Sequence, residues 1–95
     1  MSDPLPTDDQ RRCLNEMVAD AFVDIRNLLA GNPGPEDTAR AHHLAYTFHN
    51  LPREMYGWGT WSVERTRGSL GRYCDMFPGD PNYLAMFNAI YPGNR

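Results

Sequence analysis

A continuous helical stripe near the N-terminus most limits what this chain can fold into. Between positions 14 and 29, apolar side chains recur at steps of three and four residues, which places them on one helix face. Thr7 and Gln10 precede the stripe with the spacing of a capping box, and Gly31 ends it. We predict a long amphipathic helix whose apolar face the rest of the chain must cover. The stripe contains Leu14, Met17, Val18, Ala21, Phe22, Ile25, Leu28 and Leu29.

Capping residues and prolines in the rest of the chain predict three more helices. The second starts at Pro35-Glu36-Asp37, carries apolar residues from Ala41 to Leu51, and stops at Pro52. The third runs from about Trp61 to Met76, with Thr60 or Ser62 as its N-cap. The fourth is short: Asp80 caps it and Pro81 takes the first helical position.

No segment alternates apolar and polar residues at a period of two, so we expect no sheet. The predicted fold is all-α: a compact bundle of three main helices plus a short C-terminal helix. Its 95 residues, 41% of them hydrophobic, suit a single domain over 1–95 with one modest core. Residues 1–6 are expected to be flexible.

Composition excludes several classes of protein. No apolar run approaches the ~20 residues of a membrane span, and no secretory signal is recognisable at the start. A cytoplasmic location follows as the expectation, with Cys13 and Cys74 reduced. The formal net charge is −3 and no basic run occurs, which argues against nucleic-acid binding.

Three carboxylates form an acidic row on the first helix. Glu16, Asp20 and Asp24 stand at successive i+4 positions, where like charges repel by about 0.2–0.5 kcal/mol per pair. Three settings relieve that repulsion: solvent, internal arginines on the third predicted helix, or the basic surface of another protein. The internal candidates are Arg65, Arg67 and Arg72.

The connection at 49–61, HNLPREMYGWGTW, is unusually rich in large side chains. Such residues either fold over the open end of a small helical core or serve as anchors of an interface, where Tyr, Trp, Met and Arg are enriched. We expect Trp61 to be buried and at least one of Tyr56 and Trp58 to remain partly exposed. Arg53 precedes them in the same segment.

The three histidines do not have the spacing of a helical metal pair. His42 and His43 diverge by about 100° around a helix, and His42 and His49 lie about 10 Å apart along its axis. Tyr46 stands one turn from both His42 and His49, so the three form a row beside the apolar face. We expect His49 to bond a backbone carbonyl where the chain turns. No phosphate loop or nucleophile elbow occurs, and we expect no metal, no cofactor and no enzymatic activity.

The stretch AHHLAYTFHNLP at 41–52 resembles the helix end, closing in His-Asn-Leu-Pro, of small uncharacterised bacterial helical proteins. The resemblance covers about a dozen residues. It implies a bacterial origin and a helical fold, and it transfers no activity.

The leading functional hypothesis is a small acidic protein-binding module. Its narrower form is an immunity protein or antitoxin-like inhibitor of a toxic enzyme, with a basic toxin or nuclease as partner, since carboxylates can occupy a basic cleft in place of phosphates. Two hypotheses compete with it: a metal-binding protein or small enzyme built on His42, Tyr46 and His49, and a structural homodimer formed through the Tyr56–Trp61 segment. The candidate partner-binding residues are Glu16, Asp20, Asp24, Arg53, Tyr56 and Trp58.

Overall fold

The computed structural model describes residues 3–92, and every regular element in that range is a helix. The all-α class is therefore confirmed for the described residues. No helix within them combines the length and hydrophobicity that crossing a membrane requires. The helices are α1 (Asp8–Leu28), α2 (Pro35–Phe48), α3 (Leu51–Glu54), α4 (Val63–Met76) and α5 (Tyr83–Ile90).

Local capping chemistry sets the starts of the three longest helices as predicted. The Thr7 hydroxyl accepts from the Gln10 amide at 3.2 Å while the Gln10 side chain accepts from the Thr7 amide at 2.8 Å, which completes the capping box of α1. Pro35 lies in the first turn of α2, where its missing N–H costs nothing. Ser62, one of the two predicted caps, accepts from the Arg65 amide at the start of α4.

Two predicted boundaries are wrong. Pro52 does not stop the second helix: α2 ends at Phe48, and Pro52 lies in the first turn of α3, a position that tolerates proline. The last helix begins at Tyr83 rather than at Pro81, because Asn82 and not Asp80 accepts a hydrogen bond from the Ala85 amide.

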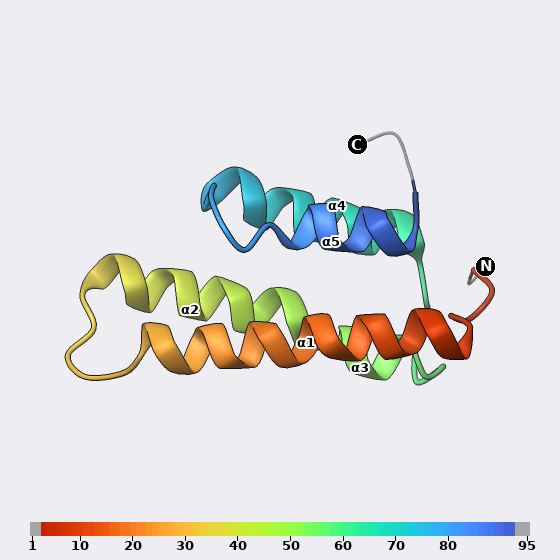
Figure 1. Ribbon diagram of the computed structural model, residues 1–95, viewed down its shortest axis with the longest axis horizontal. Coiled ribbons are helices and arrows are strands. Elements are labelled where there is room, and N and C mark those ends of the chain that lie inside the picture. The colour runs from red at the N-terminus through yellow and green to blue at the C-terminus, as the bar shows by residue number, and fades with distance from the viewer. Residues whose placement is uncertain (1–2, 93–95) are drawn as a thin grey trace.

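The helices lie in two layers (Figure 1). In the first layer α1 and α2 run antiparallel, and α3 continues beyond the end of α2 beside the first half of α1. In the second layer α4 and α5 pack on each other and cover the first layer. The long α1 contacts α2, α3 and α5, so its apolar stripe is the surface against which these three helices pack.

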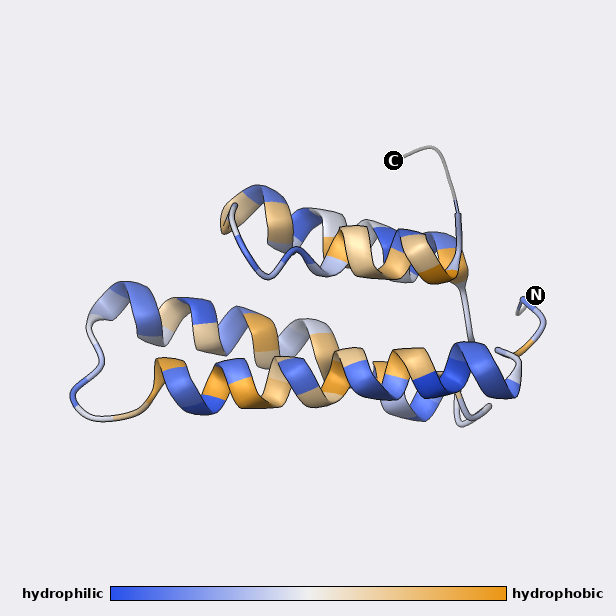
Figure 2. Cartoon of the chain, in the orientation of Figure 1, coloured by the Kyte–Doolittle hydropathy of each residue, from blue (hydrophilic) through white to orange (hydrophobic). Residues whose placement is uncertain are grey.

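The core draws buried residues from all five helices, and each helix carries hydrophobic residues along its length (Figure 2). Its largest fully buried side chains are Trp61, Tyr83, Phe48, Phe87, Leu14, Leu44, Met55 and Leu70. Four of the eight are aromatic. Tyr83 meets Phe48 edge to face with ring centroids 5.1 Å apart, and it meets Tyr73 in the same way at 6.0 Å.

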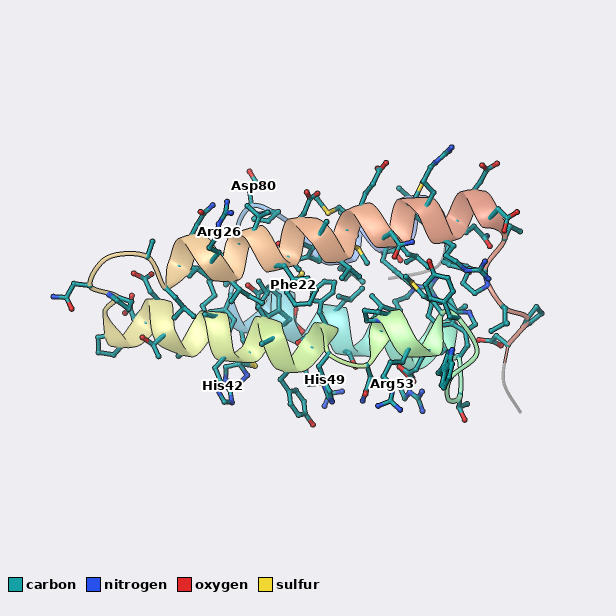
Figure 3. The ribbon with its side chains drawn as sticks, turned by 90° about the horizontal axis from the view of Figure 1, so that it is seen from below. Phe22, Arg26, His42, His49, Arg53 and Asp80 are labelled. Atoms are coloured by element: carbon teal, nitrogen blue, oxygen red, sulfur yellow. The ribbon has the colours of Figure 1, made fainter. Side chains whose placement is uncertain are left out.

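The predicted stripe on α1 is only partly correct. Leu14, Met17, Val18 and Ala21 are buried, but Phe22 is 55% exposed and Leu29 is also exposed. The stripe is wider than the surface that α2 and α5 can cover. Phe22 is left on the outer face, between α1 and α2 (Figure 3).

The N-terminal segment is attached to the start of α4. The Asp3 amide donates to the Trp61 carbonyl at 2.9 Å, and the Asp3 carboxylate accepts from the Val63 amide at 2.7 Å. Pro6 is buried. Flexibility over 1–6 stays a prediction. Within that segment Asp3 makes these contacts and Pro6 is buried, and residues 1–2 lie outside the described range.

Two phenylalanines on the two layers should respond differently to truncation. Phe87→Ala removes a fully buried ring and is expected to lower the free energy of unfolding by about 3–5 kcal/mol. Phe22→Ala, identical in chemistry, removes a ring that is half exposed and should cost about 1 kcal/mol. Urea unfolding followed by circular dichroism measures both. Equal losses would contradict the placement of Phe22 outside the core.

Candidate protein-interaction surface

The connection between α3 and α4 both completes the core and forms an exposed surface. Leu51, Met55 and Trp61 are buried, and they close the end of the core where α3 meets α4. Tyr56 is half exposed and Trp58, at 75%, is the most exposed large apolar residue in the described chain. The sequence prediction for Tyr56, Trp58 and Trp61 is confirmed. We call residues 56–58 the aromatic loop.

The backbone of the aromatic loop is held by its own hydrogen bonds. The Gly57 amide donates to the Glu54 carbonyl at 3.0 Å, and the Trp58 amide donates to the Arg53 carbonyl at 2.9 Å. Gly57 has φ +86°, a left-handed conformation that costs glycine little and other residues considerably more. Trp58 thus lies on a turn that backbone hydrogen bonds hold in place.

Tyr56 is fixed against α1. Its hydroxyl accepts a hydrogen bond from the Asn15 side chain at 2.9 Å, and the Arg11 guanidinium carbon lies 4.8 Å from the ring centroid, within cation–π range. Together with Glu16 these residues line a shallow depression of about 420 Å³ on the face of α1. The fold therefore brings one residue of the acidic row beside one residue of the aromatic loop.

The acidic row divides into an exposed part and an internal part. Glu16 and Asp20 are exposed and form no ion pair within residues 3–92. Arg12, one turn before Glu16, pairs with Asp9 instead. Asp24 turns inward: its carboxylate accepts from the Tyr83 hydroxyl at 3.2 Å and lies 3.7 Å from the Arg40 guanidinium. Two carboxylates of the row are left free to meet a partner.

The internal pairing proposed from the sequence is wrong in its arginines. Asp24 pairs with Arg40, which comes from α2 and not from the third predicted helix. Arg65 pairs with Glu54, and Arg67 pairs with Glu64. The reason is the order of packing: α2 and α5, not α4, are the helices that contact α1 along its length.

Arg67 is the one buried charged residue of the described chain, at 4% exposure. Its guanidinium donates to Asn88 at 2.9 Å, to the Tyr91 carbonyl at 2.6 Å and to Glu64 at 2.7 Å. A buried guanidinium needs such partners to offset lost hydration. Its role is to join α4 to the end of α5, so it is not available to a ligand.

The buried polar contact around Asp24 changes the titration of its neighbours. Desolvation is the main cause that raises the pKa of Tyr83, and the nearby Asp24 charge and hydrogen bond add to it. Desolvation also raises the pKa of Tyr73, although the hydrogen bond from the Arg40 Nε at 2.9 Å opposes this. That same hydrogen bond raises the pKa of Arg40. Asp24 is engaged in joining three helices, which removes it from the candidate binding residues.

The histidine row lies on a different edge from the acidic residues. His42, His49 and Arg53 all point away from α1 (Figure 3). His49 Nδ1 lies 2.8 Å from the Tyr46 carbonyl, which confirms the predicted backbone bond and requires a proton on that nitrogen. The His42 ring is 6.2 Å from that of His43. Within residues 3–92 no three His, Cys, Asp or Glu side chains are placed to hold a metal ion.

Sequence reasoning missed the residues that support the aromatic loop. Arg11 and Asn15 hold Tyr56 from a helix some forty positions earlier in the chain. They stand four residues apart on α1 and so share a face, but nothing in their spacing indicates an aromatic partner. Only the packing of α3 beside α1 brings them together.

Comparisons with known proteins define no family for this chain. No family model matches the sequence, and no solved structure matches it. A similar sequence occurs in the "Probable bifunctional SAT/APS kinase 2" of Sorangium cellulosum (strain So ce56), which is 32% identical over 92 residues. The match covers 97% of this chain and 15% of that protein, so the chain spans a small part of the relative's length.

The polar contact between Asp24 and Tyr83 should appear in the alkaline stability of the protein. Because folding raises the pKa of Tyr83, the folded state keeps its phenolic proton above pH ~10, where the unfolded chain loses it. The unfolded state then binds fewer protons, so stability falls as pH rises, by up to about 1.4 kcal/mol per pH unit for one tyrosine. In Tyr83→Phe, the free energy of unfolding is expected to fall less steeply between pH 10 and 11.5, because the contribution of the Tyr83 proton is gone.

Urea unfolding at several pH values measures this slope. Tyr46→Phe is the matched control, since Tyr46 is 72% exposed and forms no hydrogen bond to Asp24. An unchanged slope in Tyr83→Phe would contradict the buried contact.

Proposed function

We propose that this protein is a protein-binding module whose contact surface combines the aromatic loop with the exposed acids of α1. The surface consists of Tyr56, Trp58, Glu16 and Asp20. Two residues predicted from the sequence are left out of it: Asp24 is used inside the fold, and Arg53 projects from another edge.

The observation that carries the proposal is an exposed tryptophan on a rigid turn. Exposing a large ring to water is unfavourable for folding, by up to about 1.5–3 kcal/mol relative to burial. Trp58 is nevertheless held outward by backbone hydrogen bonds to Arg53 and by the conformation of Gly57. Tryptophan is the residue type most enriched among interface anchors, and a preordered anchor loses little entropy on binding.

The charge beside the anchor favours a basic partner. Glu16 borders the same depression as Tyr56, and Asp20 follows one helical turn later. Carboxylates without internal partners attract Arg and Lys side chains and speed encounter with a positively charged surface. Two arginines line the depression as well, but both have partners within the fold. Arg11 contacts the Tyr56 ring and donates to the Pro6 carbonyl, and Arg12 pairs with Asp9.

The similarity to part of a larger protein supports a modular role beside an enzyme. The Sorangium cellulosum protein is named as a probable bifunctional enzyme, and a sequence like this chain makes up 15% of it. We infer that this type of helical unit works next to catalytic domains, and that the partner here is an enzyme. The narrower proposal is inhibition of a toxic enzyme with a basic cleft, in the manner of an immunity protein or antitoxin, in a bacterial cytoplasm.

The two competing functions have weaker support. A metal site or a catalytic centre on His42, Tyr46 and His49 needs side chains that converge. The three side chains are exposed, and no group of three possible metal ligands occurs within residues 3–92. A homodimer through the aromatic loop remains a distinct outcome of the experiment below.

Removing the anchor should abolish most of the binding energy. The protein is immobilised, its captured partner is purified, and the affinity is measured by calorimetry for wild type and variants. Trp58→Ala is expected to weaken binding by at least about 30-fold, the effect of a ~2 kcal/mol anchor. Tyr46→Ala is the matched control: its ring is 72% exposed but lies on another face.

Equal losses for the two variants, or none for Trp58→Ala, would reject the aromatic loop as the contact. Sedimentation of the protein alone at high concentration tests the homodimer. Self-association that Trp58→Ala abolishes would replace the proposed partner with a second copy of the chain.

The acidic part of the surface is tested separately through charge and salt. Glu16→Arg is expected to slow association with the purified partner severalfold and to weaken its dependence on ionic strength, because a favourable long-range attraction becomes a repulsion. Asp75→Arg makes the same change in net charge at an exposed position of α4 and should leave the association rate nearly unchanged. Stopped-flow kinetics between 20 and 300 mM salt distinguish the two.

A further inference from the structure

A second concave surface lies between α2 and α4, away from the aromatic loop. It is an open groove of about 580 Å³, within the size range of small-molecule sites. One wall carries His43, Tyr46 and His49 from α2 and the turn after it. The other wall carries Arg65, Ser69 and Arg72, which share one face of α4.

The charges in the groove are not balanced. Its single carboxylate, Glu54, is paired with Arg65, which also donates to the Thr60 carbonyl. Arg72 is exposed and forms no ion pair or hydrogen bond within residues 3–92. With both histidines neutral the groove still carries one uncompensated positive charge, located on a side chain that presents up to five N–H donors.

Polar groups without internal partners stand beside this arginine. Ser69 lies one turn before Arg72, and its hydroxyl has no hydrogen bond to the described part of the chain. On the opposite wall, the bond from His49 Nδ1 to the Tyr46 carbonyl orients the imidazole, and Nε2 is then the acceptor nitrogen of the neutral ring. A tetrahedral oxyanion needs donors, so the guanidinium of Arg72 and the hydroxyl of Ser69 are the groups that can hold it.

Ring and apolar surfaces make up part of the rest of the groove. Tyr46 is 72% exposed, and its ring centroid is 5.7 Å from that of His49, with the two planes tilted by 35°. Met76, which also lines the groove, is 47% exposed. A planar apolar group can lie on these surfaces while an attached anion reaches Arg72.

From this combination we propose that the groove binds a small organic oxyanion, a phosphate or sulfate monoester of an aromatic or heterocyclic group, with Arg72 as its charge partner and Tyr46 as its stacking face. The site is independent of the aromatic loop, since it lies on other elements and uses none of the same residues. If so, the chain binds a small molecule in this groove in addition to its proposed protein partner.

The test is a titration of the full chain followed by two-dimensional amide NMR, with four probes. Phenyl phosphate and phenyl sulfate carry both the anion and the ring, inorganic phosphate carries the anion alone, and phenol carries the ring alone. The proposal expects saturable shifts at His49, Ser69 and Arg72 with at least one of the two esters. It expects at least about tenfold weaker binding of inorganic phosphate and of phenol, since each lacks half of the contacts.

Matched variants identify the charge partner. Arg72→Gln is expected to weaken ester binding by about ten- to a hundredfold, the loss of a charge-assisted hydrogen-bonding pair. Arg26→Gln removes the same charge from an exposed position on α1, toward the opposite edge from His49 (Figure 3), and should leave the affinity unchanged. Tyr46→Ala is expected to weaken the esters severalfold and to leave inorganic phosphate unaffected. Thermal unfolding of each variant should match wild type, because the three side chains are exposed.

Three results would overturn the proposal. If Arg72→Gln and Arg26→Gln weaken ester binding equally, the anion is attracted to the net charge of the protein and not to the groove. Phenol binding as tightly as the esters would mean a merely apolar surface. The absence of saturable shifts in the groove at millimolar probe would mean that no oxyanion site exists there.

Discussion

Burial of Trp61 is the contact on which the arrangement of this end of the molecule depends. Its fully buried ring lies 6.0 Å from that of Tyr91, and its carbonyl accepts the Asp3 amide, so one residue joins the chain's start, the head of α4 and the end of α5. Since Met55 is buried on the other side of the aromatic loop, the short segment between them must arch outward. The exposure of Trp58 is thus a consequence of how deeply its neighbours are packed.

The carboxylates of α1 show how one regular pattern serves two purposes. Asp24 lies where α2 and α5 both approach, so it meets Arg40 and Tyr83 and contributes to the internal structure. Glu16 and Asp20 form no ion pair within residues 3–92, and they remain in solvent. The mutual repulsion along the row is reduced by taking one member inside. What remains outside gives the proposed partner surface its charge.

The two proposed sites differ in charge and in position. The aromatic loop is bordered by free carboxylates, whereas the groove between α2 and α4 contains the free guanidinium of Arg72. A basic protein and a small oxyanion therefore do not compete for the same surface.

The sequence by itself determined the helical class, the start of α1 at Thr7 and of α2 at Pro35, and the contrast between Trp61 and its exposed neighbours. These follow from local rules: capping, spacing and the apolar size of a side chain act within a few residues. Only the tertiary structure decided that Phe22 is left outside the core, that Arg40 is the partner of Asp24, and that a groove forms beside Arg72. Each of these depends on which helices approach one another, and charge or hydrophobicity along the chain does not specify that.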